Sequence, residues 1–387
     1  MRILIILTYY RPHTSGLTIY VERLSKALVK RGHQVTILTS KFLPELPTDE
    51  YMEGAHIVRA PVLYKISKGV IMPTFGVLAT KYVLKNDIIH LHLPQFDAAG
   101  IAMRGRILKK PTVITYHCDI TLPPSLFNRV VNSTVNGMNN LAAIFAHRIV
   151  TYTQDFADHS HYLKRFNSKV AIITPPVELP QALPNGIHNF SVDNNIGKDN
   201  GQRAPVIGMA ARFAAEKGIE VLLDSLPQIL NQFPNSLVLF AGQYQNVLDE
   251  DTYFQKHSKR IKEYQKQGVW KFLGILNPLQ MASFYPNLDL LVVPSLNSTE
   301  SFGLVQIEAM MNGVPVVASN LPGVRQPVKM TGMGEIAEVG DPLSLTQSIL
   351  KVLENPSKYQ GNPTAVSQRF SPDTTAEAYE NLFEQLL

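Results

Sequence analysis

"RILIILT" (residues 2–8), at the start of the chain, is the first of three segments that indicate the fold class. The other two are "LTIYVERLSKALVKRG" (17–32) and "QVTILTS" (34–40). The first is a continuous apolar run of the kind found in strands buried on both faces, and the third also reads as a strand. The middle segment has apolar residues at helical spacing and ends at Gly32, a common residue after a helix. A strand, a helix and a second strand in this order predict a β-α-β unit within a parallel sheet.

The same alternation of expected strands and helices appears in both halves of the 387-residue chain. A stretch rich in Asn, Gly and Asp separates the two halves. Two doubly wound α/β domains are therefore expected, an arrangement that places loops after strand ends around a cleft. We predict an N-terminal domain over residues 1–180, a linker over 181–204, a second domain over 205–370 and a final helix over 371–387.

Composition limits the class of protein. Hydrophobic residues make up 45% of the chain and charged residues 17%, enough to build two cores. Cys118 is the only cysteine in the sequence, which excludes an internal disulfide framework and fits a reducing cytoplasm. No apolar run reaches the ~18 residues that span a bilayer, and the N-terminal run reads as a strand rather than a signal peptide.

The charge is unevenly distributed. Residues 1–178 carry 21 Lys and Arg against 11 Asp and Glu, a net of +10, whereas residues 179–387 carry 15 against 20, a net of −5. A basic first half suits contact with a membrane surface or a phosphorylated partner, and ordinary surface solvation explains it equally well. The sequence contains no recognised nucleic-acid-binding motif, so we expect no nucleic acid partner.

The stretch "ESFGLVQIE" places Glu300 in a loop after an expected strand and Glu308 on the helix that follows. Carboxylates accept hydrogen bonds from sugar hydroxyls, and backbone N–H groups at a helix start attract phosphate oxygens. The stretch "ARFAAEKG" places Arg212 and Lys217 in another strand-to-helix loop, where two cations could neutralise a diphosphate. Each residue alone fits a solvated surface; together they indicate a site.

The first half offers fewer candidates. Gly16 opens a helix after the first strand, where the backbone could approach a ligand, and His117 follows another strand end. His90 and His92 lie on one strand face, but no third metal ligand has useful spacing, so structural roles are favoured and no metal site is expected. The dinucleotide fingerprint Gly-x-Gly-x-x-Gly is absent after the first strand.

In combination these motifs resemble the retaining glycosyltransferases of family 4, which have the GT-B fold of two Rossmann-like domains. The stretch from "SLNSTESFG" to "PVVAS" resembles their Glu-x7-Glu signature, "ARFAAEKG" their Arg-Lys diphosphate motif, and residues 9–39 their opening loop and helix. The resemblance covers nearly the whole chain. It implies transfer of a sugar from a nucleotide diphosphate sugar (UDP, GDP or ADP) to a sugar or lipid-linked acceptor, without metal or cofactor.

The resemblance also implies residue roles. Arg212 and Lys217 would bind the donor diphosphate, Glu308 the ribose hydroxyls and Glu300 the donor sugar, while His117 would touch that sugar near the reacting carbon. Further donor contacts are implied for Gly16, Leu273, Gly274, Ser301, Phe302, Gly303 and Leu304. Ser15 and Ser301 stand where the family often has glycine, and the final helix would cross back to the first domain.

Several alternatives stay open at this point. A nucleotide-sugar epimerase or a sugar phosphorylase shares the fold class, and a non-catalytic sugar-nucleotide-binding protein would share the cleft. The expected location is the cytoplasm, with the basic first domain and its stretch "AMRGRILKKP" able to dock on the inner face of a membrane. The same stretch also fits an ordinary helix end with its cationic last turn.

Overall fold

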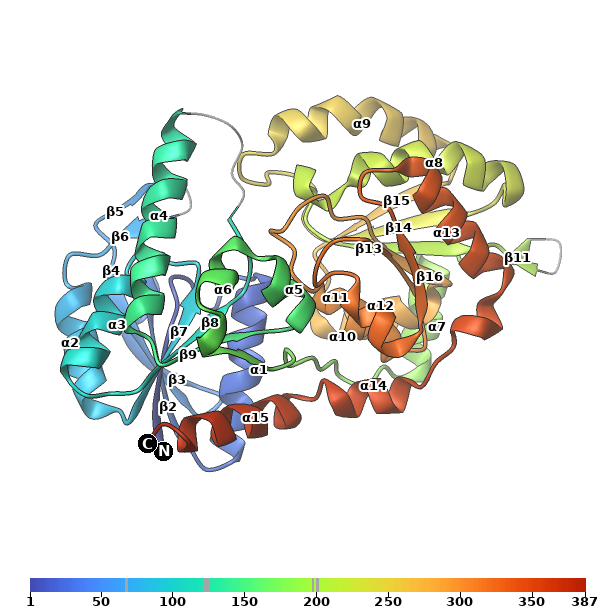
Figure 1. The fold of residues 1–387 in the computed structure, drawn as a ribbon. Helices are drawn as coiled ribbons and strands as arrows, with labels where there is room; N and C mark the ends of the chain where they lie inside the picture. The colour runs from blue at the N-terminus through green and yellow to red at the C-terminus, as the bar shows by residue number, and fades with distance from the viewer. Residues whose placement is uncertain (67–68, 121–125, 197, 200–201) are drawn as a thin grey trace. The chain divides into compact units, whose positions relative to one another are not determined.

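The computed structural model describes residues 1–66, 69–120, 126–196, 198–199 and 202–387 (Figure 1). The chain forms two compact units. Unit 1 comprises Met1–Val177 together with Phe370–Leu387, and unit 2 comprises Glu178–Arg369. Each unit contains its own sheet and its own hydrophobic core.

Unit 1 is built on an eight-stranded sheet in the order β10-β9-β8-β7-β1-β2-β4-β3. Neighbouring strands are parallel except for the antiparallel edge pair β3 and β4. A separate antiparallel pair is formed by β5 (Tyr64–Ile66) and β6 (Gly69–Ile71). The strands of the main sheet are β1 (Arg2–Ile6), β2 (Gln34–Lys41), β3 (Asp49–Met52), β4 (Ala55–Pro61), β7 (Ile88–Leu93), β8 (Thr112–Tyr116), β9 (Arg148–Thr151) and β10 (Val170–Ile172).

Helices cover this sheet because both of its faces are apolar. Leu4 and Ile6 pack in one core with residues of α2 and α3, so the alternating Ile3 and Ile5 point to the opposite face. The helices of unit 1 are α1 (Gly16–Lys30), α2 (Phe75–Lys85), α3 (Ala98–Ile107), α4 (Leu126–Phe145), α5 (Gln154–His159), α6 (His161–Arg165) and α15 (Pro372–Glu384), with a 3₁₀ turn η1 at Asn167–Lys169.

The C-terminal helix α15 belongs to unit 1 and packs on α1. Ser371 caps it by accepting from Thr374 N, and Pro372 occupies its first turn, where the missing N–H and the fixed φ of proline suit a helix start. Its apolar side carries Tyr379, whose hydroxyl lies 2.7 Å from that of Tyr20 on α1. Helix α15 is therefore an integral part of the unit 1 core.

Unit 2 contains a six-stranded, wholly parallel sheet in the order β15-β14-β13-β16-β17-β18. Its strands are β13 (Val206–Ala210), β14 (Leu237–Ala241), β15 (Trp270–Gly274), β16 (Leu290–Val293), β17 (Val316–Ser319) and β18 (Gly334–Ala337). The chain runs outward from β13 to β15 and then returns to β16 on the other side of β13. The strand order thus reverses between β13 and β16, which is where open α/β sheets bind ligands.

Helices flank this sheet, and α8 packs against α13. The helices of unit 2 are α7 (Pro184–Asp193), α8 (Ile219–Gln232), α9 (Asp251–Lys266), α10 (Pro278–Phe284), α11 (Leu304–Met310), α12 (Gln326–Thr331), α13 (Pro342–Glu354) and α14 (Pro363–Arg369), with 3₁₀ turns η2 (Ala215–Lys217), η3 (Tyr285–Asn287) and η4 (Pro356–Tyr359). A short hairpin pairs β11 (Lys198–Asp199) with β12 (Gln202–Arg203).

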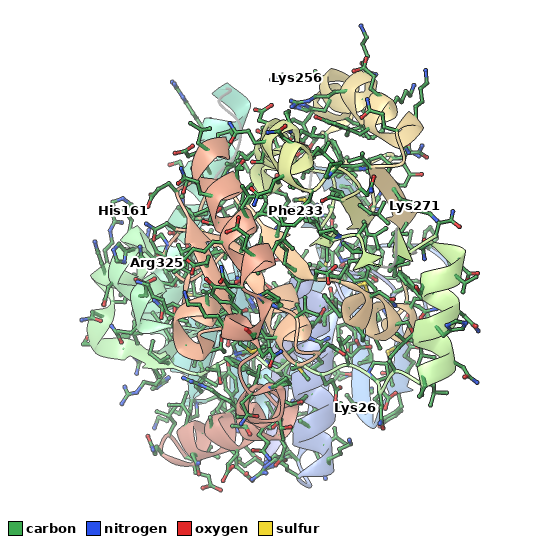
Figure 2. The ribbon with its side chains drawn as sticks, turned by 90° about the vertical axis from the view of Figure 1, so that its right-hand side faces the viewer. Lys26, His161, Phe233, Lys256, Lys271 and Arg325 are labelled. Atoms are coloured by element: carbon green, nitrogen blue, oxygen red, sulfur yellow. The ribbon has the colours of Figure 1, made fainter. Side chains whose placement is uncertain are left out.

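The predicted linker over residues 181–204 needs correction. Part of it forms α7, which packs on α10 with the Phe190 ring 6.2 Å from that of Phe284. Lys271, labelled in Figure 2, donates from Nζ to the carbonyl oxygen of Asp193 (3.0 Å) and so ties β15 to the end of α7. The sequence did not predict these apolar contacts because the segment is rich in Asn and Gly. Residues 197 and 200–201 of the segment lie outside the described ranges.

None of the helices in the described ranges combines the length and the hydropathy that crossing a lipid bilayer requires.

Candidate functional site

The carboxyl ends of β13 and β16 bring two predicted residues together. Lys217 ends the 3₁₀ turn η2 after β13, and Glu300 lies in the loop after β16. Lys217 Nζ donates to Glu300 Oε2 over 2.7 Å, and the two side chains are 19% and 23% exposed. A cation and a carboxylate thus meet at the point where the strand order reverses.

The charge state of Glu300 is set by its surroundings. Burial raises the pKa of this carboxyl, but the positive charge and hydrogen bond of Lys217 oppose it, together with backbone N–H donation from Gly303 and Phe302. The net effect lowers the pKa of Glu300, so the residue is an anion at neutral pH. The backbone amides of Phe302 and Gly303, residues for which the resemblance implies contact with the donor, therefore donate to the carboxylate of Glu300 in this structure.

Two glycines shape the loops that carry this pair. Gly303 has φ 79°, a left-handed conformation that glycine adopts without steric cost. Gly218 has φ 69°, and a Cβ at that position would lie 2.0 Å from the backbone oxygen of Pro294. The turn that ends at Lys217 therefore packs directly against the backbone that follows β16, and only glycine fits at position 218.

Glu308 lies on α11 and is 7% exposed. Tyr285 Oη donates to Glu308 Oε2 over 2.8 Å, which fixes one carboxylate oxygen. Sequence reasoning missed Tyr285, because nothing in its own stretch marks it. It reaches Glu308 from the 3₁₀ turn η3, just before β16.

Arg212 follows β13 but is less enclosed than Lys217. Its side chain is 51% exposed and forms an ion pair with Glu216, with Nη2 and Oε1 3.2 Å apart. An exposed surface ion pair contributes little stability, so this guanidinium can exchange its partner for an anionic ligand at small cost. The structure brings Lys217 to Glu300 and holds Arg212 on the same loop.

The remaining predicted donor positions of unit 2 lie at strand ends or next to Glu300. Leu273 and Gly274 close β15, and Gly274 O accepts from Gly242 N over 2.7 Å. Sequence reasoning missed Gly242. Its φ is 140°, and a Cβ at this position would lie 2.0 Å from Ala211 O, so glycine is required here as well. Ser301, Phe302 and Leu304 flank Gly303, with Ser301 and Phe302 buried.

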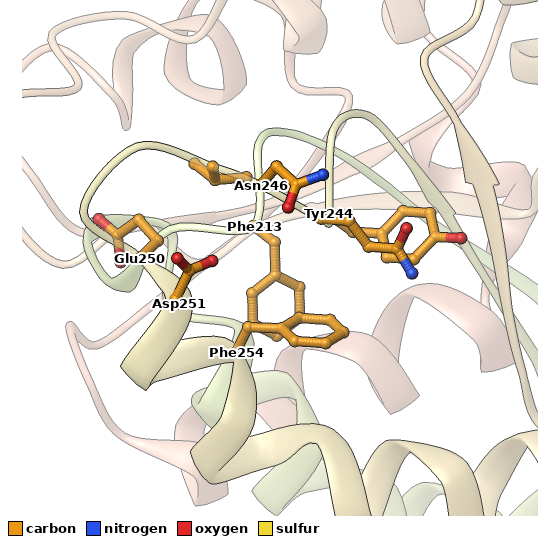
Figure 3. Close-up of a pocket in the computed structure, with 8 residues that line it drawn as sticks. Phe213, Tyr244, Asn246, Glu250, Asp251 and Phe254 are labelled. Atoms are coloured by element: carbon orange, nitrogen blue, oxygen red, sulfur yellow. The ribbon is translucent and has the colours of Figure 1, made fainter.

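A pocket of about 170 Å³ opens beside the same loops (Figure 3). Phe213 and Phe254 line its aromatic side, and Glu250 and Asp251 supply acids at the start of α9. Glu250 Oε2 also accepts from Ala215 N over 3.1 Å, which links the pocket to the turn that ends at Lys217. None of these lining residues was predicted from the sequence.

In unit 1, Gly16 is the first residue of α1, and Ser15 caps this helix by accepting from Thr18 N. Ser15, which stands where the family often has a second glycine, therefore serves as the N-cap of α1. A Cβ at Gly16 would have no atom within 4 Å, so the described packing of unit 1 does not require glycine here. This leaves room for a ligand to approach the backbone.

His117 follows β8 and is 8% exposed. Its Nε2 lies 2.9 Å from His92 Nδ1, and its Nδ1 is hydrogen-bonded to the Tyr152 hydroxyl. Burial lowers the pKa of His117 to about 3, so the ring is neutral at physiological pH. His90 and His92 are buried on β7, and within the described part of the chain no group of three His, Cys, Asp or Glu side chains could hold a metal ion.

Comparison with protein families gives a match in each half of the chain. Residues 14–181 match the model described as "Glycosyltransferase Family 4", and residues 193–364 match the model "Glycosyl transferases group 1". The two matches cover most of each unit and include the loops with Gly16, His117, Lys217 and Glu300.

Individual relatives agree with these matches. The chain is 24% identical over 376 residues to an uncharacterized glycosyltransferase of Methanocaldococcus jannaschii, covering 92% of this chain and 90% of that one. It is 24% identical over 392 residues to the phosphatidyl-myo-inositol mannosyltransferase of Mycobacterium tuberculosis, covering 99% and 97%.

Solved structures share the fold over the full length. HepE of Anabaena, in complex with UDP and glucose, superposes with a TM-score of 0.79 at 20% identity and 100% coverage of both chains. Sucrose-phosphate synthase from Thermosynechococcus elongatus gives 0.77 at 21% identity, covering 100% of this chain and 98% of that one. From its two domain matches and this fold, the protein belongs to the group 1, family 4 glycosyltransferases with the GT-B fold.

Proposed function

We propose that this glycosyltransferase moves a hexosyl group from a nucleotide diphosphate sugar to an acceptor hydroxyl with retention of the anomeric configuration. The observation that carries the proposal is the Lys217–Glu300 pair at the reversal of strand order in unit 2. A cation suited to a diphosphate lies there against a carboxylate suited to sugar hydroxyls, and a nucleotide diphosphate sugar presents both groups.

Cleavage of the donor's anomeric C–O bond places negative charge on the leaving diphosphate and positive charge on the sugar. In the proposed reaction Lys217 and Arg212 stabilise the diphosphate, a preorganised electrostatic contribution that reaches a few kcal/mol for each donor group. Lys217 is already oriented by Glu300, whereas Arg212 exchanges Glu216 for the ligand. The site therefore needs little rearrangement to receive the leaving group.

The two glutamates have different proposed tasks. Glu300 accepts from hydroxyls of the donor sugar, and Glu308 accepts from the ribose, with Tyr285 holding one of its oxygens in place. In a retaining glycosidase, by contrast, a pair of carboxylates would serve as acid and nucleophile. Here the acceptor attacks on the same face as the leaving diphosphate, whose oxygen takes the acceptor proton, and no protein base is required.

The proposal is tested with UDP-, GDP- and ADP-sugars in the absence of acceptor, by measuring slow release of nucleotide diphosphate. We expect release from one donor class, lost in Glu308→Ala and kept in the matched control Glu263→Ala, an exposed acid on α9. Isomerised sugar without free diphosphate would instead identify an epimerase. Visible absorbance of a pyridoxal cofactor would indicate a phosphorylase, and a thermal shift without turnover would indicate a binding protein.

For the acceptor side we propose a lipid-linked or otherwise membrane-associated sugar, with peripheral contact through α3. Met103 and Ile107 are exposed on this helix; Arg106, next to Ile107 in the chain, and Lys109, just after the helix, are exposed as well. Cations next to exposed apolar side chains favour anionic lipid surfaces. Co-sedimentation with phosphatidylglycerol vesicles should fall in Arg106→Glu/Lys109→Glu, and equal sedimentation of the two proteins would refute this contact.

A further inference from the structure

His117 is held on both ring nitrogens by residues from the two neighbouring strands. His92 lies on β7, His117 follows β8 and Tyr152 follows β9, and these strands are adjacent in the sheet. His92 Nδ1 is 2.9 Å from His117 Nε2, and the Tyr152 hydroxyl is bonded to His117 Nδ1. The Tyr20 ring packs edge-on against the imidazole, with centroids 5.0 Å apart.

The hydrogen-bond pattern selects one tautomer. His92 Nε2 is buried and has no hydrogen-bond partner among the described residues. If His92 donated from Nδ1, Nε2 would be an unpaired acceptor, whereas the opposite arrangement would bury an unpaired N–H donor. Buried unpaired donors are rarer and less favourable than unsatisfied acceptors, so His92 donates from Nδ1 to His117 Nε2. Neutral His117 then carries its proton on Nδ1 and donates it to Tyr152.

The C-terminal helix helps to hold this arrangement. Tyr379 on α15 lies 2.6 Å from the Thr115 hydroxyl, which is 2.7 Å from His90 Nε2. Thr115 lies on β8 two residues before His117, and the His90 ring packs 4.3 Å from that of His92. Helix α15 thereby fixes the strand ends from which His92 and His117 project.

We propose that His92 and Tyr152 are positioning residues that fix His117 as its Nδ1–H tautomer, with both ring nitrogens engaged. Its catalytic significance rests on the proposed function, together with the contact between His117 and the donor sugar that the family resemblance implies. With Nε2 accepting from His92 and Nδ1 donating to Tyr152, neither ring nitrogen serves as a general base in this arrangement.

The tautomer can be measured without substrate. In protein labelled with ¹⁵N-histidine, long-range ¹H–¹⁵N correlation spectra distinguish protonated from unprotonated ring nitrogens, and comparison with His117→Gln identifies the His117 signals. We expect a protonated Nδ1 and an unprotonated Nε2, unchanged between pH 6 and pH 8 in the full chain. A protonated Nε2 with an unprotonated Nδ1, or a ring that titrates in this range, would overturn the proposal.

Three variants separate positioning from a merely structural role. An Asn amide nitrogen can replace the Nδ1–H donor, so His92→Asn should keep the His117 tautomer, whereas His92→Leu should lose it. Tyr152→Phe removes the partner of the other nitrogen with little change in volume. For the last two variants we expect mixed tautomers and kcat roughly tenfold lower at unchanged donor KM, since each loses one hydrogen bond.

The outcomes are distinct. Equal tautomer populations in wild type, His92→Leu and Tyr152→Phe would refute the positioning role. If wild type showed the expected tautomer but turned over no nucleotide sugar, the proposed function would fail and the ring arrangement would stand. A loss of kcat in His92→Asn as large as in His92→Leu would assign His92 a role other than donation to His117.

Discussion

Lys217 Nζ lies 2.7 Å from Glu300 Oε2, although the residues are 83 positions apart in the chain. The contact forms because β13 and β16 are neighbours in the sheet and both loops leave from the same edge. Each residue satisfies the other: Glu300 gives the partly buried ammonium a counter-charge, and Lys217 offsets the burial of the carboxylate. In the proposed complex the diphosphate of the donor would bind to Lys217 and its sugar to Glu300.

Replacing Lys217 should strongly weaken use of the donor. Lys217→Ala removes a positive charge that in the proposed reaction stabilises the leaving diphosphate, and we expect kcat/KM to fall by roughly 10²–10³. The measurement is steady-state release of nucleotide diphosphate. Lys256→Ala on α9, labelled in Figure 2, removes a surface lysine and serves as the control. Near-normal rates in both Lys217→Ala and Arg212→Ala would contradict the diphosphate clamp.

Tyr285→Phe should raise the donor KM about fivefold. The variant removes the hydroxyl that donates to Glu308 Oε2, and one such hydrogen bond contributes about 1 kcal/mol. Comparing each donor with its 2′-deoxyribose analogue shows whether Glu308 acts on the ribose. The preference for the ribose form should be present in wild type and largely lost in Glu308→Ala; an equal preference in both proteins would assign Glu308 another task.

Gly218→Ala should destabilise the protein far more than Gly268→Ala. Both glycines have similar positive φ values, 69° and 75°, so both variants incur the same left-handed strain of about 1–2 kcal/mol. Only at Gly218 does the new Cβ meet backbone, 2.0 Å from Pro294 O, whereas at Gly268 it meets nothing within 4 Å. Urea denaturation measures the difference. Similar midpoints would show that the close approach at Pro294 is unimportant.

Stability should decrease as the pH falls from 6.5 towards 4. Burial lowers the pKa of His90 and of His117 to about 3 and that of His92 well below its usual value. Below pH 6.5 the unfolded chain binds protons that the folded chain does not, so the free energy of unfolding drops by about 1.4 kcal/mol per pH unit for each histidine. Tyr20 and Tyr379, which face these rings, have raised pKa values because of burial and stay neutral.

A matched pair of variants assigns this pH dependence. His117→Gln should reduce the slope by one histidine's share, and His161→Gln, at an exposed position labelled in Figure 2, should leave it unchanged. Urea unfolding at pH 6.5, 5.5 and 4.5 supplies the slopes. A slope unaffected by His117→Gln would mean that this ring is charged in the folded state or that the pH dependence arises elsewhere.

The strands of unit 2 could be predicted from the sequence because parallel strands buried on both faces leave continuous apolar runs. "LDLLVVPS" contains β16, all four of whose residues are buried, and "PVVAS" contains β17. The edge strand β3 was not predicted, since it is short and partly exposed. Helix α7 was missed because its few apolar residues, such as Phe190, are spaced among Asn and Gly.

The candidate site could be predicted in part. The end of an apolar run in the sequence marks the carboxyl end of a strand, and this is how Lys217, Glu300 and His117 were placed in loops after strands. Which of these loops lie next to each other depends on the strand order, which a local sequence pattern does not encode. Tyr285 and Tyr152 reach their partners from other elements, so their roles emerged only with the structure.

Titration calorimetry with UDP, GDP and ADP on wild type, Lys217→Ala and the exposed control Glu263→Ala tests whether Lys217 binds the diphosphate of a nucleotide sugar. We expect one of the three nucleotides to bind to wild type and to Glu263→Ala with equal affinity, and at least tenfold more weakly to Lys217→Ala. Equal affinity for all three proteins, or binding of none of the nucleotides, would contradict the assignment of Lys217 and Glu300 to a nucleotide diphosphate sugar.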